Sequence, residues 1–135
     1  MKNKKIQCPY CGAPAVCRPA SMVYGNHRWQ KHNYLYICSR WPDCDAYVTA
    51  HDKDLKPMGT LANKRLRYKR VLAHQALDEL RQSQSMDTWA VYLWLQMKLN
   101  LSPDQAHIGM FSEEMCDRLI TICQESISNH PMMIT

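Results

Sequence analysis

The sequence predicts an α+β protein, in which a β-rich N-terminal part is followed by a small bundle of three to four helices. Three observations predict this order. Short β-rich runs separated by turn residues fill the first fifty residues. Apolar residues recur at helical spacing from Thr60 onward. Five of the seven cysteines lie among the first 44 residues, so the two parts also differ in chemistry.

The chain is expected to divide into three segments. Residues 1–52 form the β-rich part, and residues 53–59 form a polar linker that holds Pro57 and Gly59. Residues 60–135 form a helical module packed on the first part.

Strands are predicted at residues 15–24, 34–38 and 46–50, where β-branched and aromatic residues are frequent. Tight turns are predicted at residues 8–12 and 38–44, each of which holds a proline and two cysteines. The strands therefore present two cysteine-bearing turns.

Two long helices are predicted in the middle of the chain. The first has Thr60 as its N-cap and an apolar stripe made of Ala62, Leu66, Ala73, Leu77 and Leu80. The second starts after Ser85, has Asp87 in its first turn and runs to about Asn100. It carries Trp89, Leu93 and Met97 on one side.

Two further helices are predicted near the C-terminus. A short one starts at the run 102–105, in which Ser102 and Gln105 form a capping box and Pro103 occupies the first helical position. The last begins after Ser112 and presents one apolar face, made of Cys116, Leu119, Ile120, Cys123 and Ile127.

The composition is that of a globular chain, with 46% hydrophobic and 21% charged residues among 135. No apolar run approaches the roughly 18 to 20 residues that span a bilayer, and no apolar segment follows the basic start. We therefore expect a soluble cytoplasmic protein that has no membrane partner.

The net charge of +5 is distributed unevenly along the chain. Residues 1–50 carry seven Lys and Arg against two Asp and Glu, and residues 51–82 carry eight against four. Residues 83–135 carry two against six. A basic front suits a phosphate backbone, whereas the acidic end argues against a protein coated on all sides by nucleic acid.

The strongest motif is the spacing Cys8-x2-Cys11, then a gap of 26 residues, then Cys38-x5-Cys44. Two turns with two thiolates each can supply the tetrahedral shell that zinc prefers. Four ligands close that shell, so we predict one structural Zn²⁺ in a four-cysteine zinc ribbon.

The other three cysteines are interpreted as packing residues. Cys17 lies on a predicted strand beyond the first turn and is expected to be a spare buried thiol. Cys116 and Cys123 are seven residues apart, which is about 10 Å along a helix and too far for a disulfide or a shared zinc.

The zinc ribbon resembles the C-terminal zinc ribbons of bacterial type IA DNA topoisomerases. The resemblance rests on residues 8–12 (Cys-Pro-Tyr-Cys-Gly) and 38–44 (Cys-Ser-Arg-Trp-Pro-Asp-Cys), and it covers about residues 6–50. It implies binding of single-stranded DNA. The insert between the two cysteine pairs is longer here, so no loop contacts carry over.

Nearly the whole chain resembles the zinc-finger-containing proteins of phages and prophages, a family without an assigned activity. The resemblance implies a fold and a phage-type context, but no reaction. The matching runs besides the cysteine pairs are Cys44-Asp45-Ala46-Tyr47-Val48 with His51, Pro57-x-Gly59-Thr60-Leu61-Ala62, Ala73-His74 with Asp78, Tyr92-x-Trp94-Leu95, and His107-Ile108-Gly109-Met110-Phe111 with Cys116.

Aromatic residues interleaved with cations predict an interface for single-stranded nucleic acid, because bases stack on aromatic faces in basic grooves. Trp41, beside Arg40 on the second turn, is the expected exposed stacking residue. DNA and RNA remain equally open. The predicted contact residues are Arg28, Trp29, Lys31, Arg40, Trp41, Lys64, Arg67 and Arg70.

Parts of the sequence also suggest two other classes of function. A metal-dependent nuclease could use the carboxylates between Asp43 and Asp54, but no second acidic cluster completes a two-metal site, so we expect no enzyme and no small-molecule substrate. His74 and His107 are interpreted as structural residues.

The alternative function is that of an inhibitor or adaptor that binds a host or phage protein such as a defence nuclease. This alternative would be supported by an exposed patch around Trp89, Trp94, Met110 and Met115.

Overall fold

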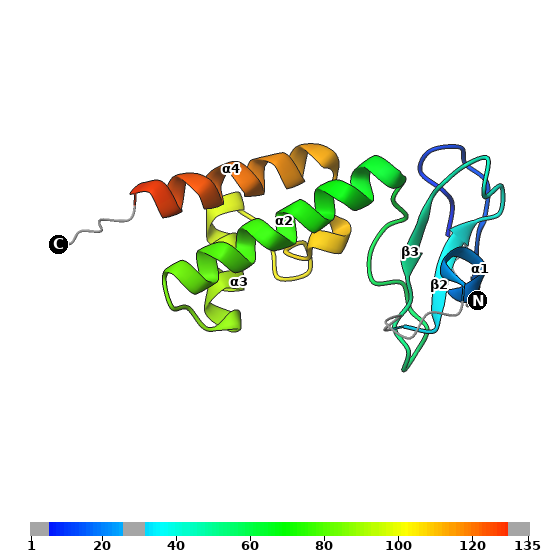
Figure 1. Ribbon diagram of the computed structural model, residues 1–135, viewed down its shortest axis with the longest axis horizontal. Coiled ribbons are helices and arrows are strands. Elements are labelled where there is room, and N and C mark those ends of the chain that lie inside the picture. The colour runs from blue at the N-terminus through cyan, green and yellow to red at the C-terminus, as the bar shows by residue number, and fades with distance from the viewer. Residues whose placement is uncertain (1–5, 26–31, 130–135) are drawn as a thin grey trace. The chain divides into compact units, whose positions relative to one another are not determined.

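The computed structural model describes residues 6–25 and 32–129, and the chain divides into two compact units. The first unit, Met1–Arg65, holds a three-stranded sheet, and the second, Leu66–Thr135, is helical (Figure 1). The predicted α+β class, with a β ribbon before a helical module, is therefore confirmed.

The sheet of the first unit is antiparallel, with strands in the order β1-β2-β3. Strand β1 (Ala15–Pro19) pairs with β2 (Tyr34–Cys38), and β2 pairs with β3 (Tyr47–Thr49). The predicted first strand ends early, because the chain turns after Pro19 into the short helix α1 (Ser21–Tyr24).

One face of the sheet forms a small core. Leu35 and Ile37 alternate along β2 and are each 1% exposed, and they cluster with Ala20 and Tyr47. Residues of α1 and the side chain of Trp41 pack against this cluster. Tyr24 meets Tyr47 edge to face, with ring centroids 5.9 Å apart.

The stretch predicted to be a linker is part of the first unit. Ala50 pairs with Pro57, and Tyr47 exchanges two backbone hydrogen bonds with Ala62, at 3.1 and 3.0 Å. Because the backbone of Ala62 is paired to the sheet, it cannot join a helix. The first long helix, α2 (Lys64–Ser83), therefore begins four residues after the predicted cap Thr60.

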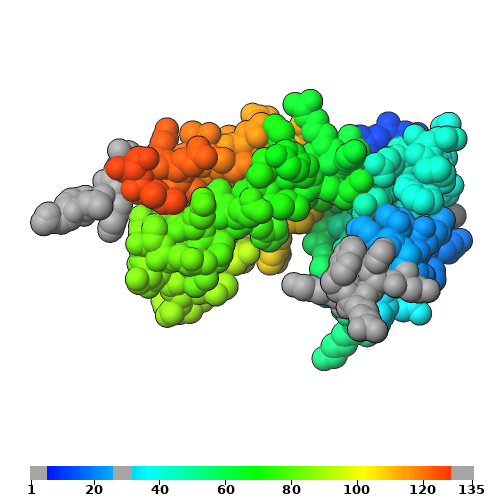
Figure 2. All heavy atoms as spheres, viewed as in Figure 1, coloured from blue at the N-terminus to red at the C-terminus, as the bar shows by residue number. Residues whose placement is uncertain are grey.

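The second unit is built from α2, α3 (Thr88–Leu99), the 3₁₀ turn η1 (Ile108–Met110) and α4 (Glu113–Asn129). Helices α2 and α4 lie side by side (Figures 1 and 2), joined by Lys69 to Asp117 at 2.7 Å and Gln84 to Ser126 at 3.3 Å. No helix of the described residues combines the length and apolar character needed to cross a membrane.

The capping box at Ser102 forms but starts no helix. The Ser102 N–H donates to Gln105 Oε1 at 3.0 Å, and the Gln105 N–H donates to Ser102 Oγ at 3.3 Å. His107 then adopts an extended conformation, which places its neighbours Ala106 and Ile108 in the core at 1% and 2% exposure. Burial of these two apolar side chains outweighs the local helix signal, and the prediction of a helix here is wrong.

Helix α3 buries one of its two apolar faces and exposes the other. Val91, Leu95 and Leu99 are buried, whereas Trp89, Leu93 and Met97 are 70%, 47% and 75% exposed. The helix is apolar on most of its circumference, so the spacing of apolar residues alone did not distinguish the core face. An exposed apolar stripe of three large side chains results.

Candidate metal centre

The four predicted zinc ligands come together at one end of the sheet. Their sulfur atoms all lie within 4.8 Å of one another. The Sγ atoms of Cys8 and Cys44 are 3.6 Å apart, and those of Cys11 and Cys38 are 3.5 Å apart. A tetrahedron with Zn–S bonds of about 2.3 Å has sulfur–sulfur edges of about 3.8 Å. The sulfur cage therefore matches the size of a Zn²⁺ shell.

The first turn is shaped by backbone hydrogen bonds around Cys8. Its N–H donates to the Ala13 oxygen at 2.8 Å, and its oxygen accepts from Gly12 at 2.9 Å. Gly12 has φ of +82°, a conformation that strains any residue with a Cβ, although the space around it is open. The turn therefore requires glycine for its backbone conformation.

The second turn begins at the end of β2, where Cys38 is the last strand residue. Trp41 donates to the Cys38 oxygen at 2.9 Å, and Cys44 donates to the Arg40 oxygen at 3.1 Å. Pairing of Cys38 with Ala15 holds this turn beside the first one. The two turns are thus fixed by the sheet, as expected for a ribbon.

The surroundings shift the pKa values of the thiols in the metal-free cluster in opposite directions. A backbone hydrogen bond from Ala13 is the main cause that lowers the pKa of Cys11 to about 7. Burial raises the pKa of Cys38 and of Cys44. The N–H of Arg40 donates to Cys38 Sγ at 3.4 Å, a contact that supports a thiolate.

These residues make one structural Zn²⁺ site. All four ligands are thiols, and four thiolates leave no coordination position for an activated water. In the described part of the chain, no other group of three or more Cys, His, Asp or Glu could share a metal. Cys17 lies on β1 opposite Tyr36 and is only half-buried, whereas we expected a buried thiol. Cys116 and Cys123 are fully buried in α4, as predicted.

The chain belongs to the family of zinc-finger-containing domains. The family matches residues 4–126, which include both turns and the helical unit. No curated protein and no solved structure matches the chain.

The predicted nucleic-acid contacts differ in their accessibility. Arg40 and Lys64 are exposed in the first unit, and Arg67 is half-buried on α2. Arg28, Trp29 and Lys31 lie outside the described residues. Trp41 is half-buried against the core of the sheet, whereas we expected an exposed ring.

Arg70 requires a correction, because its side chain is 8% exposed. Its Nε and Nη2 donate to the Phe111 oxygen at 3.1 and 3.0 Å. The guanidinium is therefore committed to the interior of the helical unit, and we remove it from the set of contact residues.

Tyr10, on the first zinc turn, is 44% exposed, and no local sequence pattern singled it out. Its Oη accepts a hydrogen bond from the Asn63 N–H at 3.1 Å. The two residues are 53 positions apart, so no local pattern could have indicated the contact.

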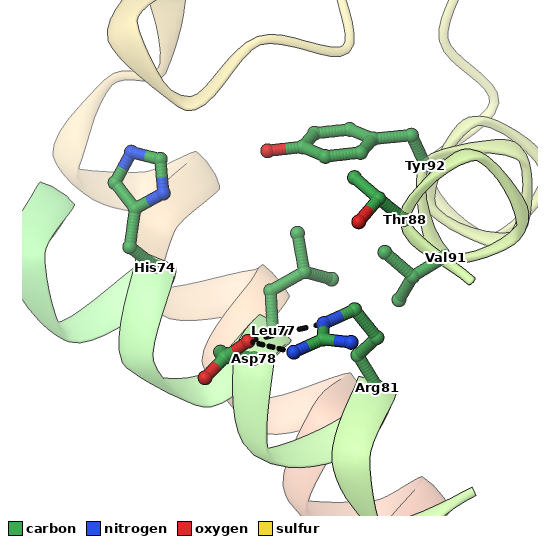
Figure 3. A pocket seen from close by; sticks show the side chains of 7 residues that line it. All are labelled: His74, Leu77, Asp78, Arg81, Thr88, Val91 and Tyr92. Atoms are coloured by element: carbon green, nitrogen blue, oxygen red, sulfur yellow. Dashed lines mark hydrogen bonds and ion pairs between the residues drawn. The ribbon is translucent and has the colours of Figure 1, made fainter. Parts of the chain in front are cut away.

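The helical unit carries a hollow of about 300 Å³ between α2 and α3 (Figure 3). Both oxygens of Asp78 accept hydrogen bonds, from Arg81 at 2.9 and 3.1 Å and from Gln82 at 2.7 Å. Burial lowers the pKa of His74, and its ring points away from Asp78. Asp78 is therefore not placed to orient His74 as a general base.

Proposed function

We propose that this is a small zinc-ribbon protein that binds single-stranded nucleic acid through the basic surface of its first unit. The observation that carries the proposal is the charge of the two units. Residues 1–65 hold eleven Lys and Arg against four Asp and Glu, and residues 66–135 hold six against eight. Such a division favours phosphate contacts on the ribbon alone.

The zinc end of the ribbon carries two exposed cations. Arg40 is exposed on the second zinc turn, and Lys64 is exposed where α2 begins. Both extend from backbone that the sheet and the metal hold in place. Rigid placement reduces the ordering cost of binding.

The proposal includes no catalytic step. The metal has a closed shell, so it supplies neither a bound water nor a Lewis acid. Asp52 accepts hydrogen bonds from His32 Nδ1 and the Asn33 N–H, both at 3.0 Å, and Asp54 accepts one from the Lys56 N–H at 3.0 Å. Asp52 therefore joins its turn to residues 32–33, and Asp54 holds its own turn.

The test is titration of the zinc-loaded chain with a short single-stranded oligonucleotide and with the duplex of the same sequence at low salt. We expect tighter binding of the single strand, with log K falling by about 0.7 per phosphate contact for each log unit of salt. The double variant Arg40→Gln/Lys64→Gln should weaken binding. The matched control, Lys98→Gln/Arg118→Gln, removes equal charge from the helical unit and should not. Equal losses in both variants, or no binding by the wild type, would contradict the proposal.

A protein partner is the second candidate, and the exposed stripe on α3 favours it. Trp89 and Met97 are the most exposed large apolar residues of the described chain, at 70% and 75%. A phage-encoded adaptor or inhibitor of a host protein would use such a surface. Affinity purification from the native cell with and without nuclease separates the two candidates, because a protein partner survives nuclease and a nucleic-acid bridge does not.

A further inference from the structure

The zinc end of the ribbon combines an exposed aromatic ring with exposed cations from three places in the chain. Tyr10 comes from the first zinc turn, Arg40 from the second, and Lys64 from the start of α2. Zinc joins the two turns, because Cys11 and Cys38 place their sulfur atoms 3.5 Å apart. Lys64 is joined to the first turn by the hydrogen bond from its neighbour Asn63 to Tyr10.

The Tyr10 ring is held at both ends. Its backbone lies in the turn between Cys8 and Cys11, and its hydroxyl accepts the Asn63 N–H at 3.1 Å. A ring fixed in this way loses little rotamer freedom when another ring stacks on it. With 44% of its surface exposed, Tyr10 offers an apolar platform that is ordered before any ligand arrives.

The other aromatic residues of the described ribbon are less suited to stacking beside these cations. Trp41 uses part of its surface against the core cluster of Leu35 and Ile37. Tyr34 is 40% exposed but lies at the far end of β2 from Cys38, about 13 Å along the strand. Tyr36 is half-buried, and its hydroxyl donates to the Leu55 oxygen at 2.7 Å.

We infer that Tyr10, Arg40 and Lys64 form a one-nucleotide subsite, in which an unpaired base stacks on Tyr10 and the adjacent phosphates meet the two cations. This inference rests on the proposed function and names its stacking residue. The subsite requires an unpaired base, because a duplex keeps both faces of each base inside its own stack. It reads no base edge, so it gives little sequence preference.

The test compares Tyr10→Ala with the control Tyr34→Ala, both zinc-loaded, by titration with oligo(dT). We expect Tyr10→Ala to lower affinity about tenfold or more and Tyr34→Ala to leave it unchanged. Tyr10→Phe, which keeps the ring and loses only the anchor, should bind nearly as well as wild type. Zinc content measured for each variant separates lost stacking from a lost metal site.

A second measurement needs no variant. In NMR spectra of the wild type, the Tyr10 ring protons should shift upfield when oligo(dT) is added, because a stacked base shields them. If wild type binds but Tyr10→Ala binds equally well and the ring signals stay in place, the subsite is wrong and the proposed function stands. If the zinc-loaded wild type binds no oligonucleotide, the proposed function itself fails.

Discussion

The guanidinium of Arg70 donates two hydrogen bonds to the backbone oxygen of Phe111, from Nε at 3.1 Å and from Nη2 at 3.0 Å. The contact joins α2 to the segment that leads into α4. Phe111 itself is 3% exposed, so its carbonyl lies where water has little access. Arg70, which the sequence predicted to contact phosphate, thus satisfies the buried carbonyl of Phe111.

Replacing Arg70 should therefore affect stability and not nucleic-acid binding. Arg70→Met keeps much of the aliphatic bulk but leaves the Phe111 carbonyl without its two donors. We expect the free energy of unfolding to fall by about 1–3 kcal/mol. Urea denaturation measures the loss, and Arg118→Met, on the exposed side of α4, is the control that should change little. An unchanged midpoint for Arg70→Met would contradict the role assigned to it.

The sequence predicted the fold class and the zinc ligands because both are encoded in local spacing. The two cysteine pairs sit within single turns, and the sheet needed only to bring those turns together. The role of Arg70 could not be predicted in this way, because its acceptor is 41 residues away. The contact between Tyr10 and Asn63 could not be predicted for the same reason, because these residues are 53 positions apart.

Helix α3 allows a direct comparison of its two apolar faces. Leu95 is fully buried and Leu93 is 47% exposed, although they are two residues apart. Leu95→Ala should destabilise the protein by about 2–5 kcal/mol, whereas Leu93→Ala should cost much less, because its methyl groups are partly in water already. Thermal or urea unfolding of the two variants gives the comparison. Equal losses would mean that Leu93 is covered in solution.

Both faces of α3 are apolar, so the sequence alone does not show which of them is buried. Trp89, Leu93 and Met97 form a regular stripe at four-residue spacing, and so do Val91, Leu95 and Leu99. Periodicity identifies a helix but gives no preference between two equally apolar stripes. Tertiary packing decided between them.

Cys38→Ser should remove the metal and disrupt the first unit before the second. Cys38 supplies one of four sulfur ligands and is also the last residue of β2, so its loss opens the shell and weakens the end of the sheet. Elemental analysis should show about one zinc per wild-type chain and far less in the variant. Cys17→Ser, which changes a cysteine outside the cluster, is the control and should keep its zinc. Stoichiometric zinc in Cys38→Ser would refute the four-cysteine assignment.

Zinc affinity should rise with pH across the neutral range. In the metal-free chain burial raises the pKa of Cys38 and Cys44, so both thiols hold protons at neutral pH, while Cys11 has a pKa of about 7. Only thiolates bind zinc, so binding must release these protons. Competition with a chromophoric chelator should show tighter binding at about pH 8 than at about pH 6. A pH-independent affinity, after correction for the chelator, would contradict this account.

The buried thiols of α4 should be unreactive and should contribute to packing. Cys123 is 0% exposed, and burial raises its pKa to about 12. An ordinary thiol has a pKa of about 8.5, so above that pH the unfolded chain ionises at this position while the folded chain keeps its proton. The contribution of Cys123 to stability is therefore complete below about pH 8.5 and declines as the pH rises further. Cys123→Ala should lower the free energy of unfolding by about 1 kcal/mol or somewhat more and remove that decline, with nucleic-acid affinity unchanged.

Maleimide labelling of the native zinc-bound protein, mapped by mass spectrometry, should modify Cys17 well before Cys123. Rapid labelling of Cys123 in the native protein would show that α4 is not packed in this way.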